Sequence, residues 1–125
     1  MRTISVAAAV IRQNGRYLLC RRPSHKRHGG LWEFPGGKLH DGESVTDAIG
    51  RELWEELHVE PVRVGPVRAT IPDQGSTFVI TFVDVEIRGE PRPTEHDAVE
   101  WIAVPDLVRY PLAPSDLAFS RTLTG

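Results

Sequence analysis

The strongest periodic pattern in the chain lies between Ser44 and Pro61. At about 100° per residue, its apolar side chains form one continuous arc, made of Val45, Ile49, Leu53 and Leu57. Such an arc predicts an amphipathic helix whose apolar face packs against a sheet. Ser44 is a typical N-cap residue, and Asp47 can complete a weak capping box. We expect Pro61 to end the helix, and Gly50, which costs about 1 kcal/mol relative to alanine, to mark a close packing contact.

Shorter apolar runs predict strands on both sides of this helix. Before it they cover 5–11, 17–22 and 31–34, and an Asn-Gly hairpin signal joins the first two. After it they cover 62–71, with a break at Gly65-Pro66, then 77–87 and 99–104. A helical turn over 105–108 and a terminal helix over 115–123, capped by Ser115, complete the chain. This order indicates an α+β fold, a mixed β-sheet with helices packed on its faces.

Size and composition narrow the class of protein. A chain of 125 residues can form one core but not two, so we expect a single domain over 1–125. The formal net charge of -2 gives no basic field for nucleic acid. Cys20 is the only cysteine, which excludes a disulfide framework and a cysteine-rich zinc site. Without a secretory signal or a transmembrane run we expect a cytoplasmic protein, as a monomer or homodimer, with no membrane partner.

Three glutamates cluster in the second half of the predicted helix. Glu52, Glu55 and Glu56 lie at i, i+3 and i+4, so they share one helix face beside the apolar arc. Acidic residues there meet the negative end of the helix dipole and repel one another, which is unfavourable without a cation. Ligands with oxygen donors alone suit hard cations such as Mg²⁺ or Mn²⁺. The alternative is a solvated acidic face with an Arg51–Glu55 ion pair.

The spacing of these glutamates resembles the Nudix box. The matching positions are Gly37, Glu43, Arg51, Glu52, Leu53, Glu55, Glu56 and Val59. A match of this length is far more specific than a lone glycine motif. One position departs, because His58 stands where the family usually has glycine. Histidine tolerates the left-handed conformation better than most residues, so we expect a small stability cost and no loss of chemistry.

The resemblance extends beyond the box. The segments 21–23, 31–38 and 95–101 are similar to the MutT branch of the family. The segment 110–116 looks like the bacterial CTP pyrophosphohydrolase subgroup, which also handles modified and oxidised deoxynucleotides. The implied fold is the Nudix α/β/α sandwich. The implied reaction is Mg²⁺-dependent hydrolysis of a nucleoside triphosphate to the monophosphate and pyrophosphate, with Mn²⁺ as a possible substitute.

Matches to the family imply roles for individual residues. Glu52, Glu55 and Glu56 would hold the metal together with the Gly36 carbonyl, and one glutamate would orient or deprotonate the attacking water. Arg51 would hold the glutamates in place by ion pairing.

Two further acidic residues complete this implied site. Glu43, like Gly37, would support the loop and the outer shell of the metal. Glu95 matches an acidic residue of MutT relatives on a loop that can reach the metals.

Four residues are candidates for substrate contacts. Arg22 and Lys38 could bind phosphate oxygens, although each could equally be a surface cation. Asp116 matches the segment that faces the nucleobase in MutT relatives. Its carboxylate could accept from the N4 amino group of cytosine or from the added N–H donors of an oxidised purine; alternatively it only helps to cap the last helix. Phe78 could stack on the base, with core packing as the competing role.

The predicted function is hydrolysis of CTP, dCTP, 5-methyl-dCTP or 8-oxo-dGTP in sanitation of the nucleotide pool. Other Nudix substrates remain open, among them ADP-ribose, dinucleoside polyphosphates and capped RNA. A non-catalytic Nudix-like domain that recognises damaged bases is disfavoured, because such modules tend to lose the glutamates. A structural calcium site is excluded, because the chain has no Asp-x-Asp-x-Asp-Gly loop.

Overall fold

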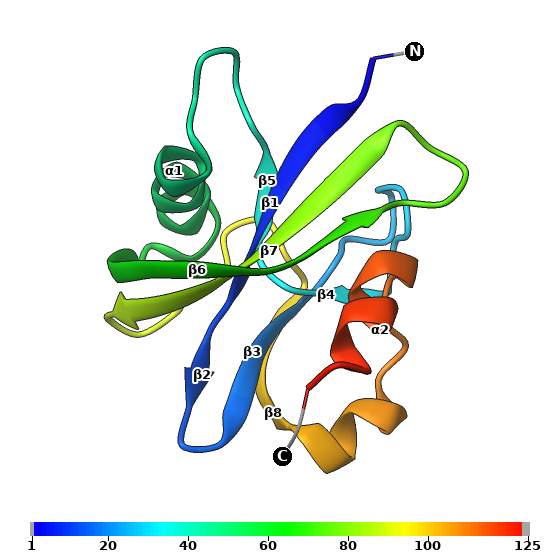
Figure 1. Ribbon diagram of the computed structural model, residues 1–125. Helices are drawn as coiled ribbons and strands as arrows, with labels where there is room; N and C mark the ends of the chain where they lie inside the picture. Colours follow the sequence, from blue (N-terminus) through cyan, green and yellow to red (C-terminus); the bar gives the residue numbers. More distant parts are fainter. Residues whose placement is uncertain (1, 124–125) are drawn as a thin grey trace.

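A mixed four-stranded sheet forms the centre of the fold (Figure 1). The computed structural model describes residues 2–123. The strand order is β5 (Gly36–Lys38), β1 (Ile4–Val10), β7 (Phe78–Arg88) and β6 (Glu60–Pro72). β1 and β7 pair in parallel, whereas β5 and β6 pair antiparallel with their neighbours. The predicted mixed sheet is therefore present, with β5 as a strand that the sequence did not indicate.

A second, antiparallel sheet is built around β3 (Arg16–Arg21). β3 pairs with β2 (Arg12–Gln13), β4 (Trp32–Glu33) and β8 (Ala98–Ala103). A 3₁₀ helix, Val104–Arg109, follows β8 where the sequence predicted a helical turn. Because only Phe34 and Pro35 separate β4 from β5, this sheet helps to set the position of the Gly36-Gly37 pair in β5.

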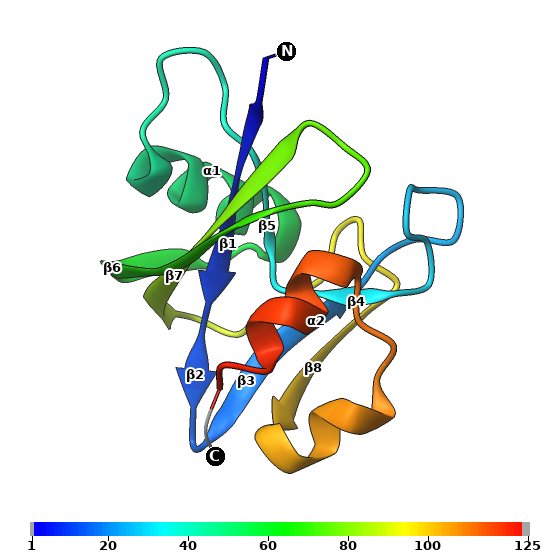
Figure 2. The same cartoon turned by 45° about the vertical axis from the view of Figure 1, so that its right-hand side comes forward.

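The two α-helices lie on opposite sides of the central sheet (Figures 1 and 2). On one side, Ala7, Ala9 and Ile11 pack in a core with the apolar arc of α1 (Val45–Leu57). On the other side, Ala8 and Val10 share a core with α2 (Pro114–Ser120), in which Phe82 and Phe119 stack with ring centroids 4.3 Å apart. The small side chains of β1 let both helices approach the sheet closely. This arrangement is the α/β/α sandwich that the sequence implied.

The two ends of α1 follow from local chemistry. The Ser44 hydroxyl accepts a hydrogen bond from the Asp47 amide, as predicted. The helix ends earlier than expected, at Leu57, because His58 adopts a left-handed conformation (φ 54°, ψ 37°) and its amide bonds to carbonyls of the last turn. Pro61 instead lies within β6. The expected close approach at Gly50 is wrong, since a Cβ there would meet only the Pro61 ring at 3.8 Å.

Two further predictions are corrected. β6 does not break at Gly65-Pro66 but continues through it with shifts in register. Ser115 does not cap the last helix, which begins at Pro114 with Ala113 as N-cap and ends at Ser120. Proline suits the first turn of a helix because its missing N–H would have no partner there. The Ser115 hydroxyl instead donates to the Asp73 carboxylate at 2.8 Å, which links α2 to the β6–β7 turn.

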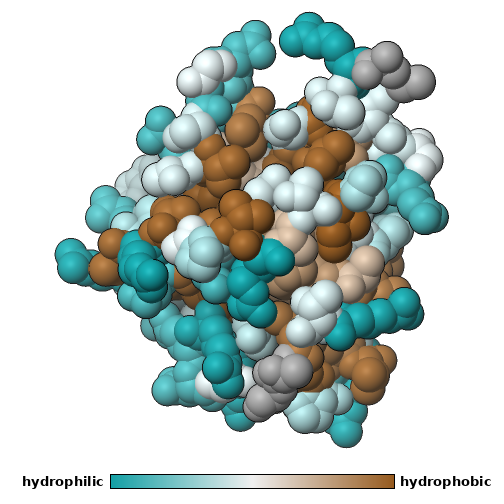
Figure 3. Space-filling view, viewed as in Figure 1, coloured by the Kyte–Doolittle hydropathy of each residue, from teal (hydrophilic) through white to brown (hydrophobic). Residues whose placement is uncertain are grey.

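The surface carries some exposed apolar side chains. In Figure 3 they gather toward the middle of the face, with polar side chains around its edge. The most exposed large ones come from several elements: Ile4, Trp54, Val62, Val67, Val108 and Leu117. Within residues 2–123, no helix combines the length and the apolar character needed to cross a membrane.

The left-handed His58 gives a prediction about stability. His58→Gly should raise the free energy of unfolding by about 1 kcal/mol, because glycine adopts this conformation without a Cβ clash. His58→Ala is the control, since it removes the Trp54 stacking contact but keeps the Cβ. Urea denaturation of the three proteins measures both effects. A glycine variant less stable than the alanine variant would contradict this account.

Candidate active site

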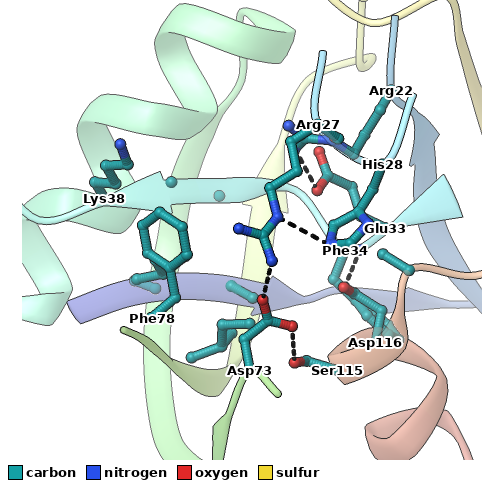
Figure 4. Close-up of a pocket in the computed structure, with 17 residues that line it drawn as sticks. Arg22, Arg27, His28, Glu33, Phe34, Lys38, Asp73, Phe78, Ser115 and Asp116 are labelled. Carbon is teal, nitrogen blue, oxygen red and sulfur yellow. Dashed lines mark hydrogen bonds and ion pairs between the residues drawn. The ribbon is translucent and has the colours of Figure 1, made fainter. Parts of the chain in front are cut away.

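Two neighbouring cavities lie beside β5, the edge strand of the central sheet. The larger, about 240 Å³, is bordered by Phe34, Phe78 and Asp116 and is drawn in Figure 4; we call it the aromatic cavity. The smaller, about 130 Å³, contains the carboxylates of Glu52, Glu56 and Glu95 in its wall; we call it the acidic cavity. Arg22, Glu33 and Gly36 line both. The two cavities therefore meet at these three residues.

The acidic cavity brings together predicted residues that are far apart in the sequence. Glu52 and Glu56 come from α1, Gly36 from β5, and Glu95 from the loop between β7 and β8. Glu55 does not line it, and its side chain is 53% exposed. Within the part of the chain that the structure describes, no three acidic, histidine or cysteine side chains are already grouped closely enough to hold a metal ion. The donors thus share a cavity without forming a closed coordination shell.

Glu56 is the most buried of these carboxylates. Only 5% of the residue is exposed, and its Oε1 accepts a hydrogen bond from the Gly36 amide at 3.3 Å. Burial raises the pKa of Glu56 well above its ordinary value, and the charges of Glu33 and Glu52 raise it further. A negative charge at this position needs a cation nearby.

Arg51 forms hydrogen bonds with the three neighbouring glutamates Glu43, Glu52 and Glu55. Its guanidinium donates to both oxygens of Glu43, at 2.8 and 2.9 Å, and to Glu52 at 2.8 Å. A longer contact of 3.3 Å reaches Glu55, and another bond reaches the Lys38 carbonyl. The bonds from Arg51 lower the pKa of Glu43 to about 2. Arg51 therefore fixes Glu43 and Glu52 firmly and Glu55 loosely, while Glu56 receives no bond from it.

The two glycines of the loop are required by close contacts. A Cβ on Gly36 would collide with the backbone carbonyl of Ala7 on β1. A Cβ on Gly37 would collide with the Glu52 carboxylate, only 2.5 Å away. Glycine at position 36 lets β5 pair closely with β1, and glycine at position 37 lets the β5 backbone lie directly against the Glu52 carboxylate.

The aromatic cavity contains the predicted substrate-binding residues. The Phe78 ring lies on β7, with the Lys38 ammonium 5.1 Å and the Arg27 guanidinium 5.8 Å from its centroid. Asp116 is buried and accepts a hydrogen bond from the Phe34 amide at 2.9 Å. Burial, assisted by the charge of Glu33, raises the pKa of Asp116 to about 8. Asp116 is thus mostly protonated at neutral pH, whereas its residue type alone predicts an ionised carboxylate.

The residues at these cavities that were not singled out from the sequence include Arg27, Glu33, Asp73 and His96. Asp73 accepts from the hydroxyls of Ser76 and Ser115 and from Arg27 (Figure 4). Arg27 and Ser115 are 46 and 42 positions away from Asp73 in the sequence, so these contacts leave no local signal. Glu33 lies between Trp32 and Phe34, whose side chains are both buried in the core. Because neighbouring side chains of an extended segment point in opposite directions, this alternation is the local signal that Glu33 points away from the core.

Comparison with known proteins decides the family. A family model described as the NUDIX domain matches residues 1–123. The chain belongs to the Nudix family. The predicted membership, the α+β fold and the class of hydrolase are therefore confirmed.

Several Nudix relatives cover nearly the whole chain. The CTP pyrophosphohydrolase of Escherichia coli (strain K12) is 38% identical over 120 residues, which are 94% of this chain and 88% of that protein. The 8-oxo-dGTP diphosphatase of the same strain is 30% identical over 108 residues, 83% of each protein. The crystal structure of a MutT Nudix hydrolase from Burkholderia pseudomallei has a TM-score of 0.88 and 29% identity, and the match covers 99% of this chain and 100% of that one.

The buried Asp116 predicts a pH dependence of stability. Its folded-state pKa, about 8, lies above the ordinary value of 3.8. The contribution of Asp116 to the free energy of unfolding is therefore largest below about pH 4. It decreases as the pH rises toward 8, because over this range Asp116 loses its proton in the unfolded chain while it stays protonated in the folded protein.

Asp116→Asn keeps an oxygen acceptor for the Phe34 amide and cannot ionise. Relative to this variant, the wild type should lose unfolding free energy between pH 4.5 and 7.5, with a limiting slope of about 1.4 kcal/mol per pH unit. Urea unfolding at several pH values measures the difference. Parallel pH profiles for the two proteins would show that the assignment is wrong.

Proposed function

We propose that this Nudix hydrolase is a metal-dependent nucleoside triphosphate pyrophosphohydrolase, with cytosine nucleotides or oxidised deoxynucleotides as preferred substrates. The observation that carries the proposal is the junction of the acidic and aromatic cavities at Arg22, Glu33 and Gly36. A nucleotide has the same division, with a charged phosphate chain at one end and a flat base at the other. The relatives named above act on such substrates, according to their names.

The donors of the acidic cavity fit a hard divalent cation. Glu52, Glu56, Glu95 and the Gly36 carbonyl would supply only oxygen ligands, the type that Mg²⁺ and Mn²⁺ prefer. Glu56 supports this assignment most strongly, because it is buried beside two other carboxylates and, within residues 2–123, its side chain receives one hydrogen bond, from Gly36. The bound metal would neutralise phosphate charge and acidify the attacking water.

The protein supplies the positioning and the proton acceptor. Arg51 keeps Glu52 aimed into the acidic cavity, so that residue needs little rearrangement when a metal binds. A glutamate of the box accepts the proton of the attacking water. Arg22 and Lys38, which both line the aromatic cavity, would bind phosphate oxygens where the two cavities meet.

Asp116 supports the choice of base. In its protonated form it offers one O–H donor and one oxygen acceptor. These match the adjacent N3 acceptor and N4 amino donor on the pairing edge of cytosine. In its ionised form it would accept from the N–H donors of an oxidised purine instead. Phe78 and Phe34 would contact the base faces, with Phe34 held by its packing against Phe82 and Phe119.

A nucleotide panel tests the proposal directly. The panel contains CTP, dCTP, 5-methyl-dCTP, 8-oxo-dGTP, dGTP, ADP-ribose and a dinucleoside tetraphosphate, each with Mg²⁺. We expect the highest kcat/KM for a cytosine or 8-oxoguanine triphosphate, with pyrophosphate and the monophosphate as products. Release of orthophosphate would refute the cleavage position. Preference for ADP-ribose or the dinucleoside tetraphosphate would refute the substrate class.

One test variant and one matched control variant are assayed with the best substrate of the panel. Glu56→Gln should lower kcat by at least about 10²-fold, because the loss of a metal-holding charge removes transition-state stabilisation. Glu60→Gln makes the same chemical change at an exposed position at the start of β6, and should leave kcat unchanged. Equal rates for both variants would refute the role of Glu56.

A further inference from the structure

The loop between β7 and β8 is anchored at three of its residues, Thr94, His96 and Asp97. Thr94 bonds through its amide and hydroxyl to the Glu55 and Glu56 carbonyls, at 2.6 to 3.1 Å. The Asp97 amide donates to the Arg21 carbonyl at 3.0 Å. Between these anchors, Glu95 faces the acidic cavity and His96 turns inward to Glu33. The loop therefore ties the end of α1, β3 and β4 together.

His96 makes a single hydrogen bond from a buried position. Its side chain is 6% exposed, and its Nε2 lies 2.9 Å from Glu33 Oε2. Its other ring nitrogen, Nδ1, has no hydrogen-bond partner within residues 2–123. Because a carboxylate only accepts, the Nε2 atom carries the proton. The one directed interaction of the ring is thus with Glu33.

Glu33, which contacts His96 through one carboxylate oxygen, contacts Arg22 through the other. Its second oxygen, Oε1, accepts from Arg22 Nη1 at 2.9 Å, and Arg22 Nε donates to the Arg27 carbonyl. These two bonds hold the guanidinium from two sides. Within the described chain, the Nη2 group of Arg22 makes no side-chain hydrogen bond. Arg22 and Glu33 are also two of the three residues shared by the cavities.

We propose that His96 is a positioning residue for substrate binding: through Glu33 it holds the Arg22 guanidinium at the junction of the two cavities. This inference rests on the proposed function, because it assigns Arg22 to the phosphates. Without the His96 donor, one oxygen of a half-buried carboxylate has no partner, and Glu33 turns toward another donor. Arg22 then loses its orientation, while Glu95 keeps its place because Thr94 and Asp97 still anchor the loop.

The kinetic test compares three substitutions of His96. His96→Phe removes the donor, and His96→Asn keeps a polar side chain that is too short to reach Glu33. Both should raise KM for the best nucleotide about 10- to 100-fold, the scale of a hydrogen bond to a charged group. The change in kcat should stay within about threefold, because binding to phosphate is lost in ground and transition states alike. His96→Gln places an amide donor near Nε2 and should restore KM to within about threefold of the wild type.

His25→Phe is the matched control, since His25 is exposed in the 23–30 loop and lines neither cavity; it should leave both constants unchanged. Wild-type KM for His96→Phe or His96→Asn would overturn the inference. A Gln variant as defective as the Phe variant would also overturn it, because that result indicates a packing role alone.

A second readout does not depend on activity. In ¹⁵N NMR of the wild type, His96 should show the Nε2–H form, and the Arg22 Nε–H signal should report an ordered side chain. The Arg22 signal should stay ordered in His96→Gln and become mobile in His96→Phe and His96→Asn. If the wild type hydrolyses no nucleotide, the proposed function is wrong. The NMR experiment still tests whether His96 orients Arg22 through Glu33, because it does not require activity. An Arg22 signal that is equally ordered in every variant would overturn it.

Discussion

Burial of the Glu56 carboxylate against the Gly36 amide is the constraint around which the site is built. An uncompensated buried charge is expensive, and one hydrogen bond from a backbone amide offsets only part of the cost. Glu33 and Glu52 add repulsion. Arg51 is directed to Glu43, Glu52 and Glu55 instead. Among the described residues no cation forms an ion pair with Glu56, and under the proposed function a divalent cation from solution would supply the missing positive charge.

The fold supports this unfavourable arrangement through packing on both faces of β1. Ala7 and Ala9 let α1 lie close to the sheet, and the apolar arc of α1 is fully buried from Ile49 to Leu57. That burial fixes the helix face on which Glu52 and Glu56 stand. Gly37 then lets β5 approach the Glu52 carboxylate without a Cβ between them, while Gly36 lets the same strand lie against β1. Stability of the core offsets the strain of the charged cluster, a common balance at functional sites.

Sequence reasoning succeeded where the signal is local or periodic. The arc of α1, the Ser44 cap and the spacing of Glu52, Glu55 and Glu56 all follow from helical geometry. It failed where distant segments meet. His96 and Glu33 are 63 positions apart, and Ser115 and Asp73 are 42 apart. Capping preference alone assigned Ser115 to its own helix, but Pro114 begins that helix and the hydroxyl bonds to a distant carboxylate.

Burial also changed the chemistry of residues that the sequence identified correctly by position. Asp116 was expected near the base as a charged acceptor, yet its burial, assisted by the charge of Glu33, raises its pKa and favours the protonated form. The glutamates of the box were treated as equivalent. In the structure Glu56 is buried, Glu52 is held by Arg51, and Glu55 is half exposed. A pattern of residue types does not contain these differences, because they depend on which segments cover each side chain.

The most direct test is the unfolding of the wild type and Glu56→Gln by urea, each with and without Mg²⁺. Without Mg²⁺, the glutamine variant should be at least as stable as the wild type, because a neutral amide replaces a buried charge and still accepts from Gly36. Mg²⁺ should stabilise the wild type, since it binds the folded state alone, and should leave the variant nearly unchanged. Equal stabilisation of both proteins by Mg²⁺ would contradict the central role given to Glu56.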